Sequence, residues 1–353
     1  MKDCVSFKIM DGLSEFFYCM DSVYNRNFRD EAEELVHRYR SRSKNTWPVL
    51  IRFHVSDIAN QYNDLCDILR KYGVESAAII EQTPLRGGKL ALEAWHYSRQ
   101  PENYQIKMFQ SSVTGVSGSE AQMRCEFENL EKMLPVNASV SANIIRTWIY
   151  CRDLDNNYAG LVKARRELFT QWGMTEKTHY IASTGIEGKS YPHDRLVRMD
   201  SLGIFGLAPE QIEYMQALEH LSPTQIYGVT FERGTRIIYG NCSSYFISGT
   251  ASIDKYGEIM YPGNVEAQSR RMLENVEALL NNHGAQLHDL KQAVIYLRDA
   301  KDKDLVESYL QQYLDDECTY LILQSSICRP GWLLEIDGIA VNNHGNENYK
   351  ALR

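Results

Sequence analysis

The sequence predicts an α+β protein made of three tandem ββαβαββ units, of which the first is degenerate. Residues 121–153 match residues 267–299 without a gap. Both segments begin with Ala-Gln, continue through Glu-Asn-x-Glu and close on Ile-Tyr-x-Arg-Asp. In each segment, stretches with the hydrophobic period of strands and of helices follow one another in the same order. A chain built from repeated units is expected to place its binding site where units meet.

The first unit, residues 1–100, shares only the order of elements with the others. Alternating apolar positions predict strands, and apolar positions three and four residues apart predict helices. The predicted elements are strands at 5–10 and 15–23, a helix at 30–39, a strand at 49–55, a helix at 57–71, and a hairpin formed by 76–81 and 89–95.

The middle unit, residues 105–205, repeats the order of the last unit. Its predicted elements are a helix at 122–134, a strand at 144–150, a helix at 158–172, and strands at 180–183 and 196–205. A connector, residues 206–229, follows and is expected to hold a short helix within 209–221.

The last unit, residues 230–342, is the clearest and leaves a tail at 343–353. Asn264 is a plausible N-cap for its first helix, and Gly284 a plausible end. The predicted strands are 236–239, 245–253, 293–297, 320–327 and 332–341, and the second helix covers 305–313.

Each unit would cover one face of its sheet with two helices and leave the other face exposed. Three such sheets packed around a threefold axis would bury those faces within one chain. We therefore expect a pseudo-trimer in a single polypeptide, and a monomer or loose dimer in solution.

The composition and charge of the chain exclude several classes of binding partner. The net charge of −8, without a basic run, argues against nucleic acid, because phosphate binding needs clustered Lys and Arg. No apolar run is long enough to span a membrane, and the charged N-terminus has no leader pattern, so a cytoplasmic protein is expected. The eight cysteines include no Cys-x-x-Cys, and neither a metal nor another cofactor is predicted. A small anionic metabolite remains the expected partner.

The last unit resembles the Rid (YjgF) superfamily, some of whose members are labelled endoribonuclease L-PSP. The resemblance rests on Phe246-Ile-Ser-Gly-Thr-Ala251, Gln268, Glu274-Asn-Val276, Tyr296-x-Arg298-Asp299, Cys328-Arg329-Pro330 and Leu334-Glu335-Ile-Asp337-Gly-Ile-Ala340. It implies a chorismate-mutase-like fold, a trimeric arrangement with ligands in clefts between subunits, and enamine or imine deamination or metabolite binding. The Rid deaminases hold the substrate carboxylate with an Arg on the strand before the Arg-Pro turn. That strand, 320–324, has no Arg here, so a different chemistry or an Arg from another unit is expected.

A narrower resemblance is to the chorismatases, which carry Rid-like units in a longer chain. It rests on Arg146-Thr-Trp148-Ile-Tyr150, Ala164-Arg165, Ala182-Ser-Thr-Gly185-Ile-Glu-Gly188, Tyr227-Gly228 with Arg236, and the spacing from Cys328-Arg329-Pro330 to Glu335. The chain departs from that pattern at Val229, where Pro is expected, and at Ala164, where Gly is expected. The resemblance implies that Tyr227, Arg165 and Arg236 contribute to substrate binding.

Glu335 is the leading catalytic candidate. Strand alternation puts Glu335 and Asp337 on one face of an apolar strand, and burial or a neighbouring carboxylate raises a pKa. A carboxyl that stays protonated near neutral pH is a general acid. Cleaving pyruvate from chorismate or a related enol ether requires an acid of this kind. The alternative is a structural carboxylate paired with an Arg.

Other candidates have structural alternatives of similar weight. Arg329 can hold a ligand carboxylate or neutralise Glu335 or Asp337. Ser248-Gly249 offers a hydroxyl and an unobstructed N–H, or is merely a strand with a bulge. Cys328 can line the pocket or be an inert thiol.

Arg146, Trp148 and Tyr150 share one strand face, which suits a cyclic dicarboxylate or the core between units. Arg165 and Arg236 are weaker candidates. The functions left open are a chorismatase-like hydrolase, a Rid-type deaminase and a non-catalytic binder of small carboxylates.

Overall fold

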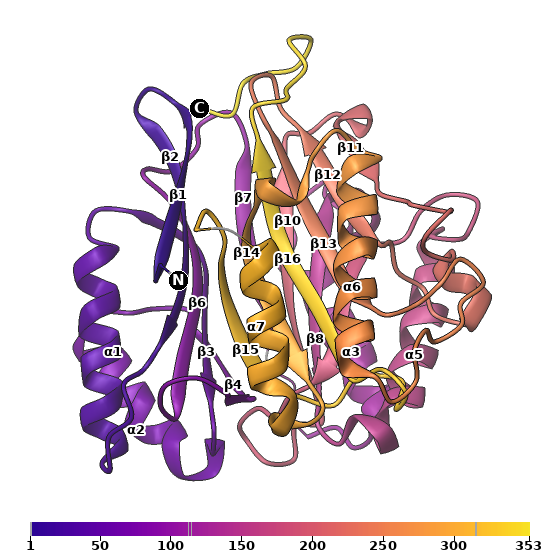
Figure 1. Ribbon diagram of the computed structural model, residues 1–353. Coiled ribbons are helices and arrows are strands. Elements are labelled where there is room, and N and C mark those ends of the chain that lie inside the picture. The colour runs from indigo at the N-terminus through magenta and orange to yellow at the C-terminus, as the bar shows by residue number, and fades with distance from the viewer. Residues whose placement is uncertain (1, 112, 114, 315) are drawn as a thin grey trace.

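The computed structural model describes residues 2–111, 113, 115–314 and 316–353, and its strands form three sheets (Figure 1). The first sheet has the strand order β1-β2-β6-β3-β4. Its strands are β1 (Cys4–Met10), β2 (Leu13–Asp21), β3 (Trp47–Val55), β4 (Ala78–Glu81) and β6 (Leu90–Tyr97), and its helices are α1 (Phe28–Arg42) and α2 (Ile58–Lys71).

The middle sheet has the order β7-β10-β8-β9. Its strands are β7 (Gln105–Gln110), β8 (Ile144–Cys151), β9 (Ala182–Glu187) and β10 (Val197–Phe205), and its helices are α3 (Ser119–Met133), the short α4 (Val140–Asn143) and α5 (Leu154–Gln171). Within the described residues a single strand, β7, precedes α3, whereas the last unit has two strands there. Ahead of α3, Gly115 and Gly118 both have positive φ, a backbone conformation that a strand does not use.

The last sheet has the order β11-β12-β13-β16-β14-β15-β5, and so recruits strands from outside its unit. Its own elements are β12 (Gly234–Ile238), β13 (Ser243–Ala251), β14 (Leu290–Leu297), β15 (Thr319–Gln324), β16 (Leu334–Asn342), α6 (Val265–Asn281) and α7 (Lys303–Tyr313). The recruited strands are β5 (Thr83–Pro84), which pairs with β15, and β11 (Ile212–Tyr214), which pairs with β12.

Two local predictions can be checked against the connector and α6. The helix expected within 209–221 is wrong: Pro209–Gln211 forms one 3-10 turn, and the chain then extends into β11 because β12 offers an edge. The predicted N-cap is confirmed, since the Asn264 side chain accepts a hydrogen bond from the Ala267 N–H at 3.0 Å.

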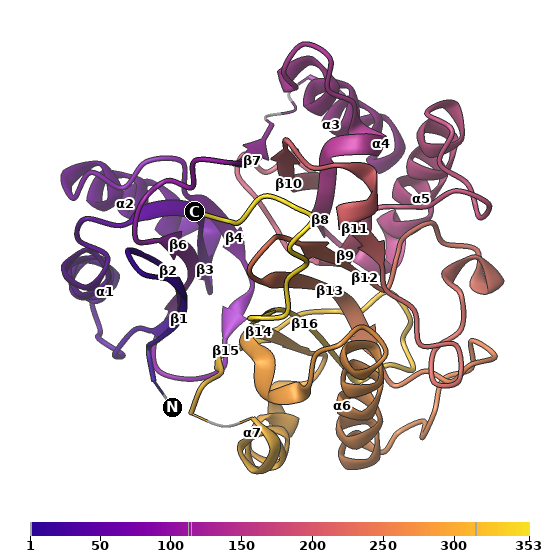
Figure 2. The same cartoon turned by 90° about the horizontal axis from the view of Figure 1, so that it is seen from above.

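The three sheets lie around a common centre with the larger helices on the outside (Figure 2). One hydrophobic core runs through all three, and Trp95 of β6 packs on Phe246 of β13 with 5.8 Å between the ring centroids. Ion pairs also cross the centre: Arg52 of β3 contacts Glu93 of β6 and Asp200 of β10. The clefts between units are therefore held in place by both apolar and charged contacts.

None of the helices in the described parts of the chain combines the length and apolar character needed to cross a bilayer.

Candidate active site

A narrow cleft lies between the middle and last units, with about 30 Å³ of free space. α5 and β9 of the middle unit form one wall, and β13 and β16 of the last unit form the other. Its lining residues are Tyr158, Arg165, Ser183, Gly185, Tyr227, Phe231, Arg233, Gly249, Ala251, Ile253, Cys328, Trp332 and Glu335. A substrate of several carbon atoms must displace some of these side chains on entry.

Glu335 stands in the wall of this cleft as the second residue of β16. Its strand neighbours Leu334 and Ile336 are buried on the opposite face, as alternation predicts. In register, Glu335 lies opposite Tyr296 of β14 and Ala251 of β13. A Cβ atom on Gly249 would lie 2.1 Å from Oε1 of Glu335, so only glycine leaves room for the carboxyl at this position.

The environment of Glu335 favours its protonated form. The residue is 4 % exposed and, within the described residues, forms no ion pair. Burial raises its pKa to about 8, the negative charge of Asp337 adds to this rise, and Arg146 and Arg233 oppose it. The carboxyl is therefore mostly protonated at neutral pH and can act as an acid.

Asp337, two residues further along β16, has a different set of partners. Its Oδ2 accepts hydrogen bonds from Thr184 Oγ1 at 2.6 Å, Arg146 Nη2 at 3.2 Å and the Tyr296 hydroxyl at 3.4 Å. Burial raises the pKa of Asp337 to about 6, and the charge of Arg146 opposes that rise. Arg146 thus forms its ion pair with Asp337, and no cationic side chain among the described residues contacts Glu335 directly.

Two guanidinium groups line the cleft without a carboxylate partner. Arg165 of α5 is 2 % exposed, and its Nε and Nη2 find no hydrogen-bond acceptor within the described residues. Arg233 donates from Nε and Nη2 to the Ser222 carbonyl, at 3.1 and 2.7 Å. Buried polar groups without partners are rare, and those of Arg165 indicate a place for an anionic ligand.

Several predicted residues meet in the cleft: Glu335, Arg165, Tyr227, Gly249 and Cys328. Burial, reinforced by the charge of Glu335, raises the pKa of the Cys328 thiol to about 12. Cys328 therefore stays protonated and is unsuited to act as a nucleophile.

Two further candidates lie beside the cleft. Ser248 is buried behind it, donating to the Glu232 carbonyl at 2.6 Å and accepting from the Ser183 N–H at 2.9 Å. Arg329 rests on the Tyr227 ring, 4.3 Å from its centroid, and donates to the Gly257 carbonyl at 2.8 Å. Arg329 supports the Tyr227 wall and does not neutralise Glu335.

The remaining candidates lie outside the cleft lining. Arg146, Trp148 and Tyr150 do share one face of β8, but that face is buried at the centre between the units. Arg236 is near the opposite end of its sheet, where its Nη1 pairs with Glu213 at 3.1 Å.

Tyr158, Phe231, Arg233 and Trp332 line the cleft without having been predicted from the sequence. Phe231 and Arg233 have the same two-residue spacing of an aromatic residue and an arginine as Trp148 and Arg146, so this pattern could have predicted them. Tyr158 and Trp332 carry no comparable local signal.

Comparisons with known proteins divide between the last unit and the whole chain. The family described as Endoribonuclease L-PSP matches residues 239–342. The chain is 29% identical over 97 residues to 3-aminoacrylate deaminase RutC of Acinetobacter baylyi, covering 27% of this chain and 76% of that protein. It is 33% identical over 97 residues to a RutC family protein of Pyrococcus horikoshii, with the same coverage of 27% and 76%.

The fold of the whole chain is similar to a crystal structure of a chorismatase. The TM-score is 0.63 with 18% sequence identity, and the match covers 92% of this chain and 98% of that chain. The likeness therefore extends across all three sheets.

Proposed function

The chain belongs to the Rid superfamily and has a chorismatase-like architecture, and we propose that it is an enzyme that cleaves pyruvate from chorismate or a related enol ether. One observation carries this proposal. Glu335, a mostly protonated carboxyl without an ion-pair partner among the described residues, shares a narrow cleft with the guanidinium groups of Arg165 and Arg233. That set combines an acid with two cations that can hold substrate carboxylates.

The first step is proton transfer to carbon. Glu335 gives its proton to the terminal methylene carbon of the enol ether, and the double-bond electron pair forms the new C–H bond. The adjacent carbon becomes an oxocarbenium ion, next to the carboxylate that Glu335 has become. Arg165 and Arg233 bind the substrate carboxylates, and the charges of Arg146 and Arg233 stabilise ionised Glu335.

The second step adds an oxygen nucleophile to the cation. When this is water, its oxygen bonds to the cationic carbon, a water proton returns to Glu335, and the hemiketal breaks into pyruvate and a ring alcohol. When a ring hydroxyl attacks instead, its oxygen bonds to the cationic carbon and its proton returns to Glu335. One ring C–O bond of the cyclic ketal then breaks as a ring proton is lost, and the resulting aryl hemiketal breaks into pyruvate and a hydroxybenzoate. The cleft, with neutral Cys328 in its lining, sets which oxygen reaches the carbon.

The direct test is to incubate the purified protein with chorismate and follow products by NMR. Release of pyruvate with a dihydrodiol or a hydroxybenzoate supports the proposal and shows where the nucleophile attacks. Glu335→Gln should abolish turnover and keep binding. Full turnover by that variant would overturn the role of Glu335.

A second candidate, a Rid-type deaminase, is favoured by the match of the last unit to 3-aminoacrylate deaminase RutC. Protonation of an enamine carbon followed by addition of water would use the same acid. β15 carries no Arg, but Arg165 of the middle unit offers a cation in the same cleft. Ammonia release from 2-aminoacrylate, without pyruvate release from chorismate, would favour this candidate.

A further inference from the structure

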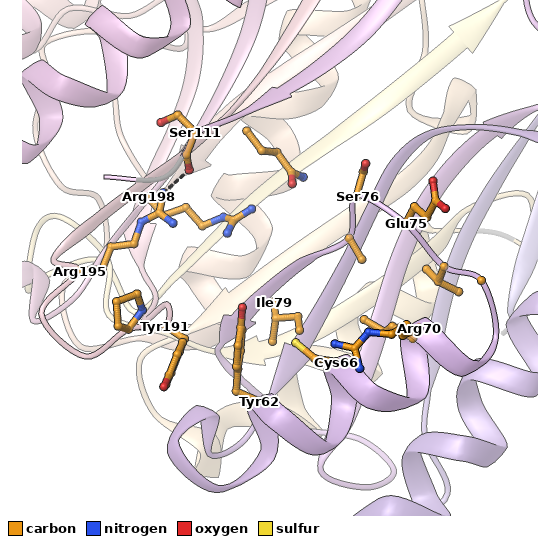
Figure 3. A pocket seen from close by; sticks show the side chains of 16 residues that line it. Tyr62, Cys66, Arg70, Glu75, Ser76, Ile79, Ser111, Tyr191, Arg195 and Arg198 are labelled. Carbon is orange, nitrogen blue, oxygen red and sulfur yellow. Dashed lines mark hydrogen bonds between the residues drawn. The ribbon is translucent and has the colours of Figure 1, made fainter. Parts of the chain in front are cut away.

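A second, larger cleft lies between the first and middle units, with a volume of about 640 Å³ (Figure 3). α2 and β4 line it on one side. The end of β7 and the segment that leads into β10 line it on the other. This volume lies within the range of small-molecule binding sites.

This cleft corresponds in position to the candidate active site. Arg198 is the second residue of β10, as Glu335 is of β16, and each strand carries an aspartate two residues later. Arg198 lies opposite Tyr150 in register, as Glu335 lies opposite Tyr296. The position that carries the acid in one cleft therefore carries a guanidinium in the other.

The helices that face these positions correspond as well. Tyr62 in α2 and Tyr158 in α5 stand at the same distance along the chain from the N-cap aspartates of their helices, Asp57 and Asp153. Each tyrosine lines its own cleft. An aromatic ring thus lines the cleft of Arg198, as one lines the cleft of Glu335.

Arg198 has hydrogen-bonding capacity left over. Its Nε donates to Asp200 Oδ1 at 3.1 Å, and its Nη atoms donate no hydrogen bond within the described residues. The side chain is 12% exposed, and Figure 3 shows its guanidinium directed into the space between the two units. Neighbouring Arg195 is different, because Glu126 at 2.7 Å and the Ser111 carbonyl at 2.6 Å hold its Nη2 in the wall.

An aromatic surface lies beside this cation. The rings of Tyr62 and Tyr191 stack with 4.4 Å between centroids and 16° between planes. Burial raises the pKa of Tyr62, and the positive charge of Arg198 opposes that rise, so the two side chains act on each other across the cleft.

The corresponding junction between the last and first units has a different character. The position that corresponds to Glu335 is Ala91, the second residue of β6. Arg86 lies on the Tyr320 ring there and pairs with Asp21 at 2.9 Å and Glu307 at 3.4 Å. That cation is neutralised by carboxylates of both units, whereas the outer face of Arg198 remains available.

We propose that the cleft between α2 and β10 is a second ligand site, which binds a small carboxylate with an aromatic or cyclic body and does not transform it. The carboxylate would accept hydrogen bonds from the Nη atoms of Arg198, and the ring would lie against Tyr62 and Tyr191. Arg198 stands where Glu335 stands in the other cleft, and a guanidinium keeps its proton at neutral pH. The bound molecule therefore meets no general acid at this position. The site is independent of any reaction at Glu335.

The experiment is a calorimetric titration of the full-length protein with benzoate, and with acetate for comparison. It is done in an Arg165→Met background, which removes a cation from the other cleft. We expect benzoate to bind more tightly than acetate, and Arg198→Gln to weaken benzoate binding by about tenfold or more, the effect of losing a charge-assisted pair. Arg99→Gln is the matched control, since Arg99 lies outside this cleft, 41% exposed and paired with Glu102.

Unchanged benzoate affinity in Arg198→Gln overturns the proposal, as does loss of all benzoate binding in Arg165→Met alone. If Arg198→Gln unfolds, as thermal melting would show, Tyr62→Ala tests the same site and should remove the preference for benzoate over acetate. Equal affinities for the two ligands in that variant support the proposal, and a retained preference contradicts it. Turnover of chorismate is scored separately, so failure of one proposal leaves the other open.

Discussion

Raising the pH through the titration of Glu335 should switch off catalysis at the cleft between the middle and last units. Only the protonated carboxyl can give a proton to carbon. An ordinary glutamate, with a pKa of 4.5, would be protonated in about one molecule in 300 at pH 7, whereas a pKa of about 8 leaves about nine in ten protonated. Burial is thus worth about 300-fold in the amount of competent acid.

The same shift has a consequence for stability. Because the folded-state pKa of Glu335 lies above the unfolded value, the folded protein binds its proton more tightly. The contribution of Glu335 to the free energy of unfolding is fully present below about pH 4.5. It decreases as the pH rises from there and is lost once the pH passes about 8. At about 1.4 kcal/mol for each pKa unit, the loss on full ionisation is on the order of 5 kcal/mol.

The assay measures kcat/KM for pyruvate release from pH 5.5 to 9.5, with thermal melting at each pH. We expect kcat/KM to fall about tenfold for each pH unit above 8. Glu335→Gln should lose activity by about 100-fold or more and should melt higher than the unmodified protein above pH 8. Glu213→Gln is the control: the same chemical change at a partly exposed residue that pairs with Arg236, outside the cleft.

A kcat/KM that rises through pH 8 would refute the reasoning, because it would identify Glu335 as a base. An alkaline melting curve shared by Glu335→Gln and the unmodified protein would show that burial does not raise this pKa.

Other consequences can be tested alongside. Arg165→Met should lower kcat/KM by about tenfold or more while melting no lower than the unmodified protein, since its Nε and Nη2 have no acceptor among the described residues; unchanged kinetics would remove it from substrate binding. Gly249→Ala should cut turnover with little change in fold, because the new Cβ would displace the Glu335 carboxyl; normal activity would contradict that packing. Arg52→Met should destabilise the fold by about 3–5 kcal/mol in urea unfolding, because Glu93 and Asp200 lose their shared cation, and a smaller cost would show that the centre repacks. Light scattering should give one or two copies of the 40.7 kDa chain, and an obligate trimer would contradict three units in one polypeptide.

Much of the fold could be predicted because it depends on local pattern. Alternation correctly placed Glu335 and Asp337 on one face of β16, and Asn264 was found as an N-cap from residue type and position. Where pairing partners decide, local pattern was insufficient. Residues 212–214 form a strand because β12 presents an edge, and β5 belongs to the sheet of another unit.

The site was only partly predictable for the same reason. Arg146 and Trp148 do share a strand face, but which faces meet at the centre depends on how three sheets pack. Arg233 comes from the residue before β12 of the last unit and Tyr158 from α5 of the middle unit, and the cleft exists only once the units are together. No single segment of sequence encodes that juxtaposition.

The strand position shared by Glu335, Arg198 and Ala91 has an evolutionary consequence. In an assembly of identical subunits, a single mutation changes the residue at every interface. A change that suits a new ligand at one interface is therefore imposed on all of them. In this chain the three positions have separate codons, so the residue at each interface can change independently of the other two. One interface can keep a general acid, Glu335, while a second carries a cation, Arg198, and the third carries an unreactive methyl group, Ala91. Specialisation of this kind needs no second gene product.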